Sequence, residues 1–414
     1  MSVTTAARRV AHFDALLLTA GIWFLAKFLR YVFPPLFGSF QDAYNVSNAA
    51  LGMAFSGFML VYAAMQFPSG VLADRLGSVT VITTGVFVAA VSSLALVVDS
   101  SFLVLVGVML VMGAGTGAHK TVAVRLLSRA YPARTGRALG VLDTFGAFAG
   151  VVAPWAVVLV AGVPFVLGAS WRLVFLSAGL CGLVLTVLFW TRVPRRIPDE
   201  MADGGTTNGV SLDEFRQYAS LFRDPRFAAF ALLTVLFSFT YNGLVSFAPQ
   251  YLTTEAGLTD GTANVLFSGL FLASLVQLVT GDLSDRVGRL PLITATLGLA
   301  SVALIAFVSL TNTAGPIVLG GALIAAGIGS HGFRPVRGAY LMSAIPDDVA
   351  GGGLGVVRTL LMGAGAIAPA IVGVISDAVG FQPAFWLLTA SVTVATGLAI
   401  VLWHTDRPPY HEKS

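Results

Sequence analysis

The fold is decided by the stretch QFPSGVLADRLG at residues 66–77. A related stretch, QLVTGDLSDRVG, lies at residues 277–288, so that the pattern Gln-x3-Gly-x3-Asp-Arg-x-Gly recurs after 211 positions. A second pattern, Gly-x-Gly-x-His-x5-Arg, begins at Gly115 and again at Gly327. Patterns that recur at a nearly constant spacing indicate that the chain is built as two similar halves.

Outside these patterns the chain is apolar enough to fill a bilayer. Of its 414 residues, 56% are hydrophobic and 11% are charged, whereas soluble proteins carry about 25% charged residues. Apolar runs of about 20 residues recur along the chain, and each can cross a hydrocarbon core as a helix. We predict twelve spans, near residues 13–37, 48–72, 79–98, 101–128, 136–162, 168–192, 226–252, 262–283, 290–310, 315–344, 352–377 and 381–404.

One long polar segment, residues 193–225, has the composition of a linker. It divides the chain into a six-helix half at residues 1–192 and a second at 226–414. Because six is an even number, both halves insert with the same orientation. The expected fold is therefore an all-α polytopic membrane protein of twelve transmembrane helices in two parallel six-helix repeats, an arrangement found in secondary transporters.

The distribution of basic residues predicts the orientation. Arg and Lys concentrate in the loops on one side of the predicted spans, and such loops face the cytoplasm. We expect a multi-pass protein of the cytoplasmic (inner) membrane with both termini in the cytoplasm. The net charge of +4 is spread over these loops, which argues against a nucleic-acid partner.

The repeated stretch resembles the signature loop of the major facilitator superfamily, G-x-x-x-D-R/K-x-G followed by two basic residues. The matching residues are Gly70, Asp74, Arg75 and Gly77, repeated as Gly281, Asp285, Arg286 and Gly288. The first copy departs from the pattern, with Ser78 and Val79 at the basic positions. The resemblance implies a central cavity lined by spans one, four, seven and ten. It also implies that Asp74 caps span eleven and Asp285 caps span five, because helix N-termini favour negative charge.

Ionisable residues inside the predicted spans are the main functional signal. Each central Lys or Arg costs about 2.5–3.5 kcal/mol to insert, so these residues need water, a partner or a ligand. Lys27 and Arg30 are three residues apart and share a helix face, as do His331 and Arg334. The predicted substrate-binding residues are Trp23, Lys27, Arg30, Tyr31, His119, Lys120, Tyr241, Asn242, His331 and Arg334.

The sign of these charges predicts the substrate class. Within the spans we identify one clear carboxylate, Asp143, against several basic groups. A cavity lined by unpaired cations selects anions, and Arg suits planar carboxylate or phosphate groups. We predict a secondary transporter for a small anion, with a coupled proton or an exchanged anion as the second partner. The basic first span is also similar to the organophosphate and organic-anion branches of the superfamily.

Other interpretations stay open at this stage. An efflux pump that exchanges drug-like or neutral solutes for protons would need a carboxylate deep in the cavity. Lys27 could instead extend to an interface, and the two span histidines could be proton carriers or structural groups. Asp143 and Arg358 occupy matching repeat positions and either pair across the halves as gate residues or pack within one half. No ATP-binding loop or catalytic cluster occurs in the sequence, so we predict no enzyme, cofactor or metal site, and we expect a monomer.

Overall fold

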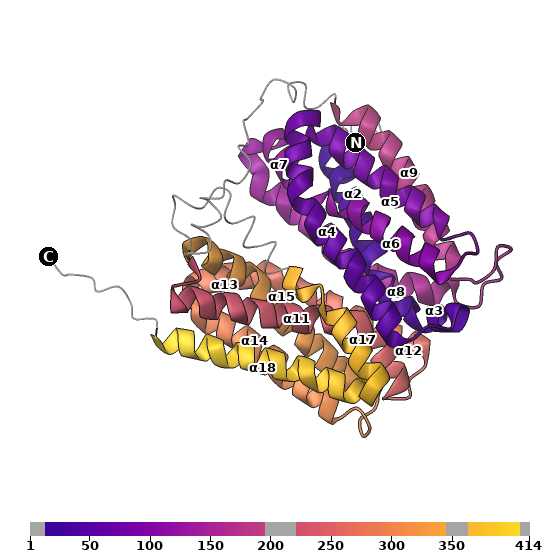
Figure 1. The fold of residues 1–414 in the computed structure, drawn as a ribbon. Helices are drawn as coiled ribbons and strands as arrows, with labels where there is room; N and C mark the ends of the chain where they lie inside the picture. Colours follow the sequence, from indigo (N-terminus) through magenta and orange to yellow (C-terminus); the bar gives the residue numbers. More distant parts are fainter. Residues whose placement is uncertain (1–12, 195–220, 345–362, 406–414) are drawn as a thin grey trace, which may run out of the picture.

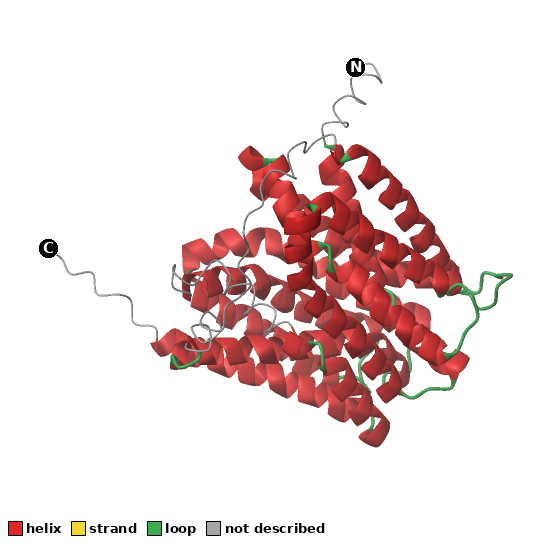
Figure 2. Cartoon of the chain, turned by 45° about the horizontal axis from the view of Figure 1, so that its top comes forward, coloured by secondary structure: helices red, strands yellow, loops and turns green. Residues whose placement is uncertain are grey.

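The structure is a computed structural model that describes residues 13–194, 221–344 and 363–405. Within these ranges the chain forms helices joined by short loops, without a strand (Figure 2). Eleven of the described helical segments are long and apolar enough to cross a membrane, and a shorter apolar helix lies at Gly363–Val379. The predicted all-α membrane fold is therefore confirmed. The first part of predicted span eleven, residues 352–362, lies outside the described ranges.

The first half of the chain forms one helical bundle, coloured indigo to magenta in Figure 1. Predicted span one continues past its first helix through a short 3-10 turn into a second helix, and predicted span four is broken at His119. The elements are α2 (Asp14–Tyr31), η1 (Pro34–Leu36), α3 (Phe37–Tyr44), α4 (Asn48–Leu76), α5 (Ser78–Ala95), α6 (Phe102–Gly117), α7 (Lys120–Ala130), η2 (Pro132–Arg134), α8 (Thr135–Val160) and α9 (Arg172–Arg192).

The second half forms another bundle, coloured rose to yellow in Figure 1. Predicted span eight is divided by a 3-10 turn just before Gln277. The described elements are α11 (Pro225–Thr254), α12 (Asp260–Leu272), η4 (Ala273–Val276), α13 (Gln277–Val287), α14 (Arg289–Ser309), α15 (Pro316–Ala344), α17 (Ala368–Val379) and α18 (Phe381–Thr405).

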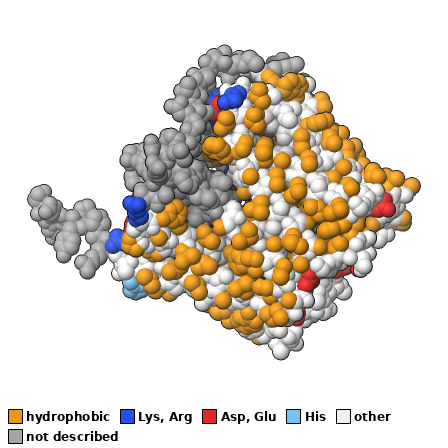
Figure 3. Space-filling model, viewed as in Figure 1, with side chains coloured by type: hydrophobic (Ala, Val, Ile, Leu, Met, Phe, Trp, Pro, Cys, Tyr) orange, Lys and Arg blue, Asp and Glu red, His pale blue; other side chains and the backbone are white. Residues whose placement is uncertain are grey.

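Hydrophobic side chains cover the flanks of both bundles (Figure 3). Leu103, Leu159 and Ile317 are 80%, 73% and 89% exposed. Soluble monomers rarely expose contiguous apolar patches of this kind. The exposed apolar belt is the surface that a multi-pass protein presents to lipid tails.

The two signature loops are tight turns between helices. Gly77 ends α4 with φ 83° and ψ 149°, and Gly288 ends α13 with φ 92° and ψ 150°. This backbone region is essentially restricted to glycine, which explains the last glycine of each repeated stretch. Asp74 forms an ion pair with Arg125 of α7, within its own bundle.

The family resemblance implies two helix caps, of which the one by Asp285 lies within the described residues. Arg134 stands at the N-cap position of α8 and its side chain makes no capping hydrogen bond, and Asp285 is exposed, so the cap of span five by Asp285 stays a prediction. α7 and α13 lie apart in the view of Figure 1. The start of span eleven, which Asp74 was expected to cap, lies outside the described residues.

The two bundles meet at the opposite end, which we call the outer end. There α4 packs against α17, and α8 packs against α12. A Cβ atom on Gly52 would lie 2.3 Å from the carbonyl oxygen of Pro369, and one on Gly373 would lie 2.4 Å from that of Asn48. The α4–α17 contact, which we call the outer seam, is therefore a backbone-to-backbone contact that these glycines permit.

Candidate functional site

A cavity of about 360 Å³ lies between the two bundles. α2, α4, α7 and α8 contribute from the first bundle, and α11, α12, α13 and α15 contribute from the second. The cavity lining includes all but one of the predicted binding residues, namely Trp23, Lys27, Arg30, Tyr31, Lys120, Tyr241, Asn242, His331 and Arg334. The structure thus brings into one cavity predicted residues that are more than 300 positions apart in the sequence.

The helical period of α2 brings three of these side chains to one face. Trp23, Lys27 and Tyr31 are spaced four residues apart, so they lie one turn above another. The Lys27 ammonium lies 4.8 Å from the Trp23 ring centroid and 5.5 Å from the Tyr31 ring centroid. Aromatic faces therefore hold this cation at the cavity wall, rather than at a membrane interface.

Arg30 connects the two bundles across the cavity. Its Nη2 donates to Oδ1 of Asn242 on α11 at 2.9 Å and lies 3.9 Å from the sulfur of Met59. The guanidinium carbon is 5.7 Å from the Tyr62 ring centroid. Arg30 is only 8% exposed, and its Nε has no hydrogen-bond partner. The amide oxygen of Asn242 thus accepts one hydrogen bond from the buried Arg30 guanidinium but does not neutralise its charge.

Arg334 supplies a cation from the second bundle. Its guanidinium carbon lies 4.1 Å from the ring centroid of Tyr241, on α11. His331, one turn earlier on α15, is 2% exposed, and its Nδ1 lies 3.5 Å from Nε2 of Gln277. The rings of His331 and Tyr241 lie nearly perpendicular to each other, with their centroids 5.7 Å apart. These contacts keep Arg334 and His331 on the cavity side of α15.

His119 is the predicted binding residue that does not line the cavity. It is 3% exposed, and its Nε2 lies 3.1 Å from the carbonyl oxygen of Thr19. Its ring stacks on Trp23 with centroids 5.8 Å apart. Because Trp23 itself faces the cavity, His119 acts here as a structural support behind it.

Asp143 pairs within its own bundle. Its carboxylate forms an ion pair with Lys120, at the start of α7, and the Lys120 ammonium lies 5.0 Å from the Trp23 ring centroid. This arrangement matches the interpretation in which Asp143 packs within one half. Arg358, its predicted counterpart, lies outside the described residues.

Several lining residues were not predicted as binding groups. Helical spacing from predicted residues could have identified Ser238 and Arg337, which lie one turn from Tyr241 and Arg334. Gln66 and Gln277 begin the repeated stretches, and Tyr62 lies one turn before Gln66. These polar additions are Tyr62, Gln66, Ser238, Gln277 and Arg337.

The cavity carries a strong excess of positive charge. Its described lining includes five cationic side chains, namely those of Lys27, Arg30, Lys120, Arg334 and Arg337, and one carboxylate, that of Asp143. Burying an ion costs several kcal/mol, and a cation–π contact returns about 0.5–2 kcal/mol. For Lys27, Arg30 and Arg334, aromatic contacts therefore offset the cost of burial only in part.

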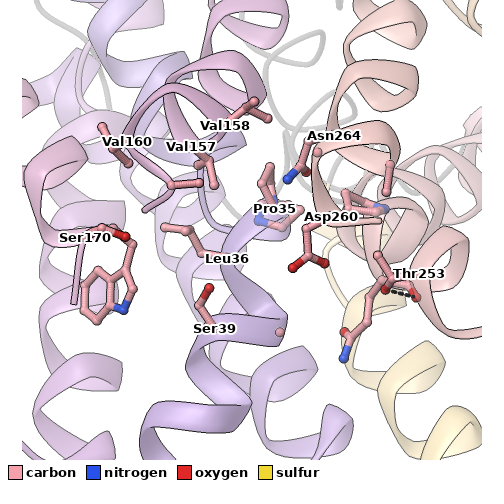
Figure 4. Close-up of a pocket in the computed structure, with 18 residues that line it drawn as sticks. Pro35, Leu36, Ser39, Val157, Val158, Val160, Ser170, Thr253, Asp260 and Asn264 are labelled. Carbon is pink, nitrogen blue, oxygen red and sulfur yellow. Dashed lines mark hydrogen bonds between the residues drawn. The ribbon is translucent and has the colours of Figure 1, made fainter. Parts of the chain in front are cut away.

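A second cavity of about 140 Å³ lies between the bundles at the outer end. Figure 4 shows Pro35 and Ser39 on its first-bundle side and Asp260 and Asn264 on its second-bundle side. The buried Oδ1 of Asn264 has no hydrogen-bond partner. The described residues that line this cavity include no Lys or Arg, so they do not share the chemistry of the central cavity. No group of three or more potential metal ligands occurs among the described residues.

Comparisons with known proteins agree with this architecture. The sequence model of the Major Facilitator Superfamily matches residues 19–366 and, in a second match, residues 230–414. A hexuronate transporter from Bacillus subtilis (strain 168) is 26% identical over 387 residues, 87% of each chain. A D-galactonate transporter from Escherichia coli is 24% identical over 400 residues, 87% of this chain and 88% of that one.

Solved structures share the fold at low sequence identity. A bacterial homolog to the human lysosomal transporter Spinster, in an inward-facing and unoccupied conformation, superposes with a TM-score of 0.79 at 16% identity, covering 96% of this chain and 99% of that one. A D-xylose-proton symporter superposes with a TM-score of 0.77 at 16% identity, covering 95% and 98%. At such identities the likeness shows the fold alone.

Proposed function

The chain belongs to the Major Facilitator Superfamily, and from this premise we propose that it carries a small organic anion of the sugar-acid class across the cytoplasmic membrane by alternating access. The superfamily consists of membrane transporters, so the chain is a transporter and not an enzyme. The observation that carries the substrate class is the cavity lining, with five cations against one carboxylate that is already paired. The names of the hexuronate and D-galactonate relatives support the same class.

The polar groups of the cavity suit a molecule with one carboxylate and several hydroxyls. Arg334 and Lys27 present cationic groups from opposite bundles, and we assign the carboxylate to them. Amide groups of Asn242, Gln66 and Gln277 both donate and accept hydrogen bonds, which is the chemistry that hydroxyl groups need. Trp23 adds an aromatic face, on which the apolar face of a sugar ring can pack.

The arrangement of the bundles supports an inward-facing state. The outer end is closed by the outer seam, while Gln66 and Gln277, at the start of the signature stretches, line the cavity on its other side. In the predicted orientation those stretches are cytoplasmic. Transport then requires the α4–α17 and α8–α12 contacts to open and the signature-loop end to close, with residues 1–192 and 226–414 moving as the two halves about the linker at 193–225.

The efflux alternative has less support in the described cavity. Proton antiport of a cationic drug would need a carboxylate accessible to both proton and drug. Asp143 is the one carboxylate of the described lining, and it is bound to Lys120.

Thermal unfolding of the purified protein with a ligand panel tests the proposed function. A ligand at 100 times its Kd stabilises the folded state by about 2.7 kcal/mol. We expect D-glucuronate or D-galactonate to raise Tm, and D-glucose, D-xylose and tetraphenylphosphonium to leave it unchanged. Arg334→Gln and Lys27→Gln should abolish the shift, while Arg192→Gln, an exposed charge at the end of α9, should keep it. A shift with the cation, or an anion shift that survives both cavity substitutions, would exclude the anion assignment.

A further inference from the structure

Without a bound anion, three cationic side chains of the central cavity lack a counter-charge. Lys27 and Arg334 face aromatic rings, and Arg30 faces an amide oxygen. No ion pair of these three side chains occurs within the described residues. In the inward-facing state, water that enters the cavity can solvate them. In an occluded state both ends are closed, and only a bound anion can take over that role.

A proton cannot replace the anion in this role. A proton on buried His331, or on the carboxylate of Asp143, makes the cavity more positive. Proton symport is favoured where a carboxylate compensates the cations of the empty carrier and is neutralised when substrate binds. Asp143 is the one carboxylate of the described lining, and its ion-pair partner is Lys120, so it pairs with none of Lys27, Arg30 and Arg334. The groups present therefore make the return of an empty, occluded cavity the slow step.

Resting on the proposed function, we propose that this transporter works as an anion exchanger, in which one anion leaves the cavity and a second must bind before the carrier can reorient. Exchange of anions of equal charge moves no net charge and requires no proton. The cationic side chains then have two roles. They select the substrate, and they prevent the transporter from cycling without one.

Uptake into proteoliposomes tests the proposal, with labelled D-glucuronate and labelled D-galactonate outside. The vesicles contain either the same unlabelled anion or D-glucose. Because uncompensated burial of even one cation slows empty return by at least about tenfold, internal anion should raise the initial uptake rate at least about tenfold. A protonophore should leave that rate unchanged. Equal uptake into both kinds of vesicle, driven by an inward proton gradient, would overturn the exchange mechanism.

Different results would refute the substrate class and the exchange mechanism. If neither sugar acid enters under any internal condition, and neither shifts Tm, the proposed substrate class is wrong. If a sugar acid enters at a rate that is independent of internal anion, the substrate class stands and the exchange mechanism is wrong.

A substitution that supplies a counter-charge tests whether uncompensated positive charge causes the slow return of the carrier without an anion. Asn242→Asp has nearly the same shape and places a carboxylate where Asn242 now accepts from Arg30 at 2.9 Å. We expect stimulation by internal anion to fall from at least about tenfold toward unity, because the empty cavity is then better compensated. Asn45→Asp, the same substitution at an exposed position between α3 and α4, should keep the full stimulation. An Asn242→Asp protein that still carries the anion with undiminished stimulation would show that uncompensated charge is not the cause.

Discussion

Asp377 offers a direct test of how the outer end closes. Its two carboxylate oxygens accept hydrogen bonds from the backbone N–H groups of Asn48 at 3.0 Å and Ala49 at 2.8 Å. A residue of the second bundle thus caps the first turn of α4, beside the cap that Ser47 provides. Loss of a helix cap costs about 0.5–2 kcal/mol. The cap exists only while the outer seam is closed, so Asp377→Ala should destabilise the conformation with a closed outer end by about this amount. If the loss is about 1.4 kcal/mol, the fraction of molecules with an open outer end rises about tenfold.

A buried position on α11 reports that change. Ser246 is 0% exposed and lies one turn from Asn242 of the central cavity and one turn from Gln250 of the outer cavity. In a Cys181→Ser background, Ser246→Cys should react with an impermeant maleimide from outside only when the outer end opens. Asp377→Ala should speed that labelling by about tenfold.

The control for this measurement is Asp42→Ala. Asp42 is exposed on α3 at the same outer end. Within the described residues it takes no part in the hydrogen bonds between the two bundles. It should leave the labelling rate unchanged. An Asp377→Ala rate equal to that of the parent, in a protein that still transports, would refute the assignment of Asp377 to closure.

Three further changes have effects that follow from single contacts. Gly373→Ala places a Cβ atom 2.4 Å from a carbonyl oxygen of α4, so we expect slower transport and faster outside labelling at an overpacking cost of about 1–3 kcal/mol. Gly77→Ala should lower the free energy of unfolding by about 1–3 kcal/mol, measured by thermal unfolding. A Cβ atom at Gly70 would have no neighbour within 4 Å, so Gly70→Ala should lower the free energy of unfolding far less. Asp99→Asn removes the ion-pair partner of Arg172. Because Asp99 is 86% exposed, the free energy of unfolding should fall by about 1 kcal/mol, which thermal unfolding would detect as a lower Tm. Added salt, which screens the ion pair, should lower the Tm of the parent protein in part.

The positions of the spans could be predicted closely because lipid imposes one strong rule. Every backbone group must bond within its own helix, so hydropathy alone determines where helices lie. Predicted span two at 48–72 is α4 at Asn48–Leu76, and predicted span nine at 290–310 is α14 at Arg289–Ser309. The convergence of charges also followed from sequence, because a Lys or Arg that cannot face lipid must face the interior.

The other features of the site depend on contacts between helices, and the spacing of residues along the sequence does not determine those contacts. His119 lies where span four breaks between α6 and α7, so the helical period that placed Lys120 in the cavity does not extend to it. The pairing of Asp143 with Lys120 required the adjacency of α7 and α8. The closure by Asp377 had no sequence signal, since a lone acid near a predicted span end is ordinary in a loop.

The exposed hydrogen bonds of Asp377 suit a contact that opens and closes repeatedly. Two conformations interconvert readily only when their free energies differ by a few kcal/mol. A buried ion pair between the bundles would cost about 3–5 kcal/mol to break and would favour one state too strongly. The carboxylate of Asp377 and the amides it caps are instead exposed, so water can replace each bond when the seam opens. The cavity cations Lys27, Arg30 and Arg334 act differently, because no carboxylate pairs with them within the described residues. In the proposed exchange mechanism, opening the outer end is therefore inexpensive, occluding the cavity without an anion is expensive, and anion binding is the step that permits reorientation.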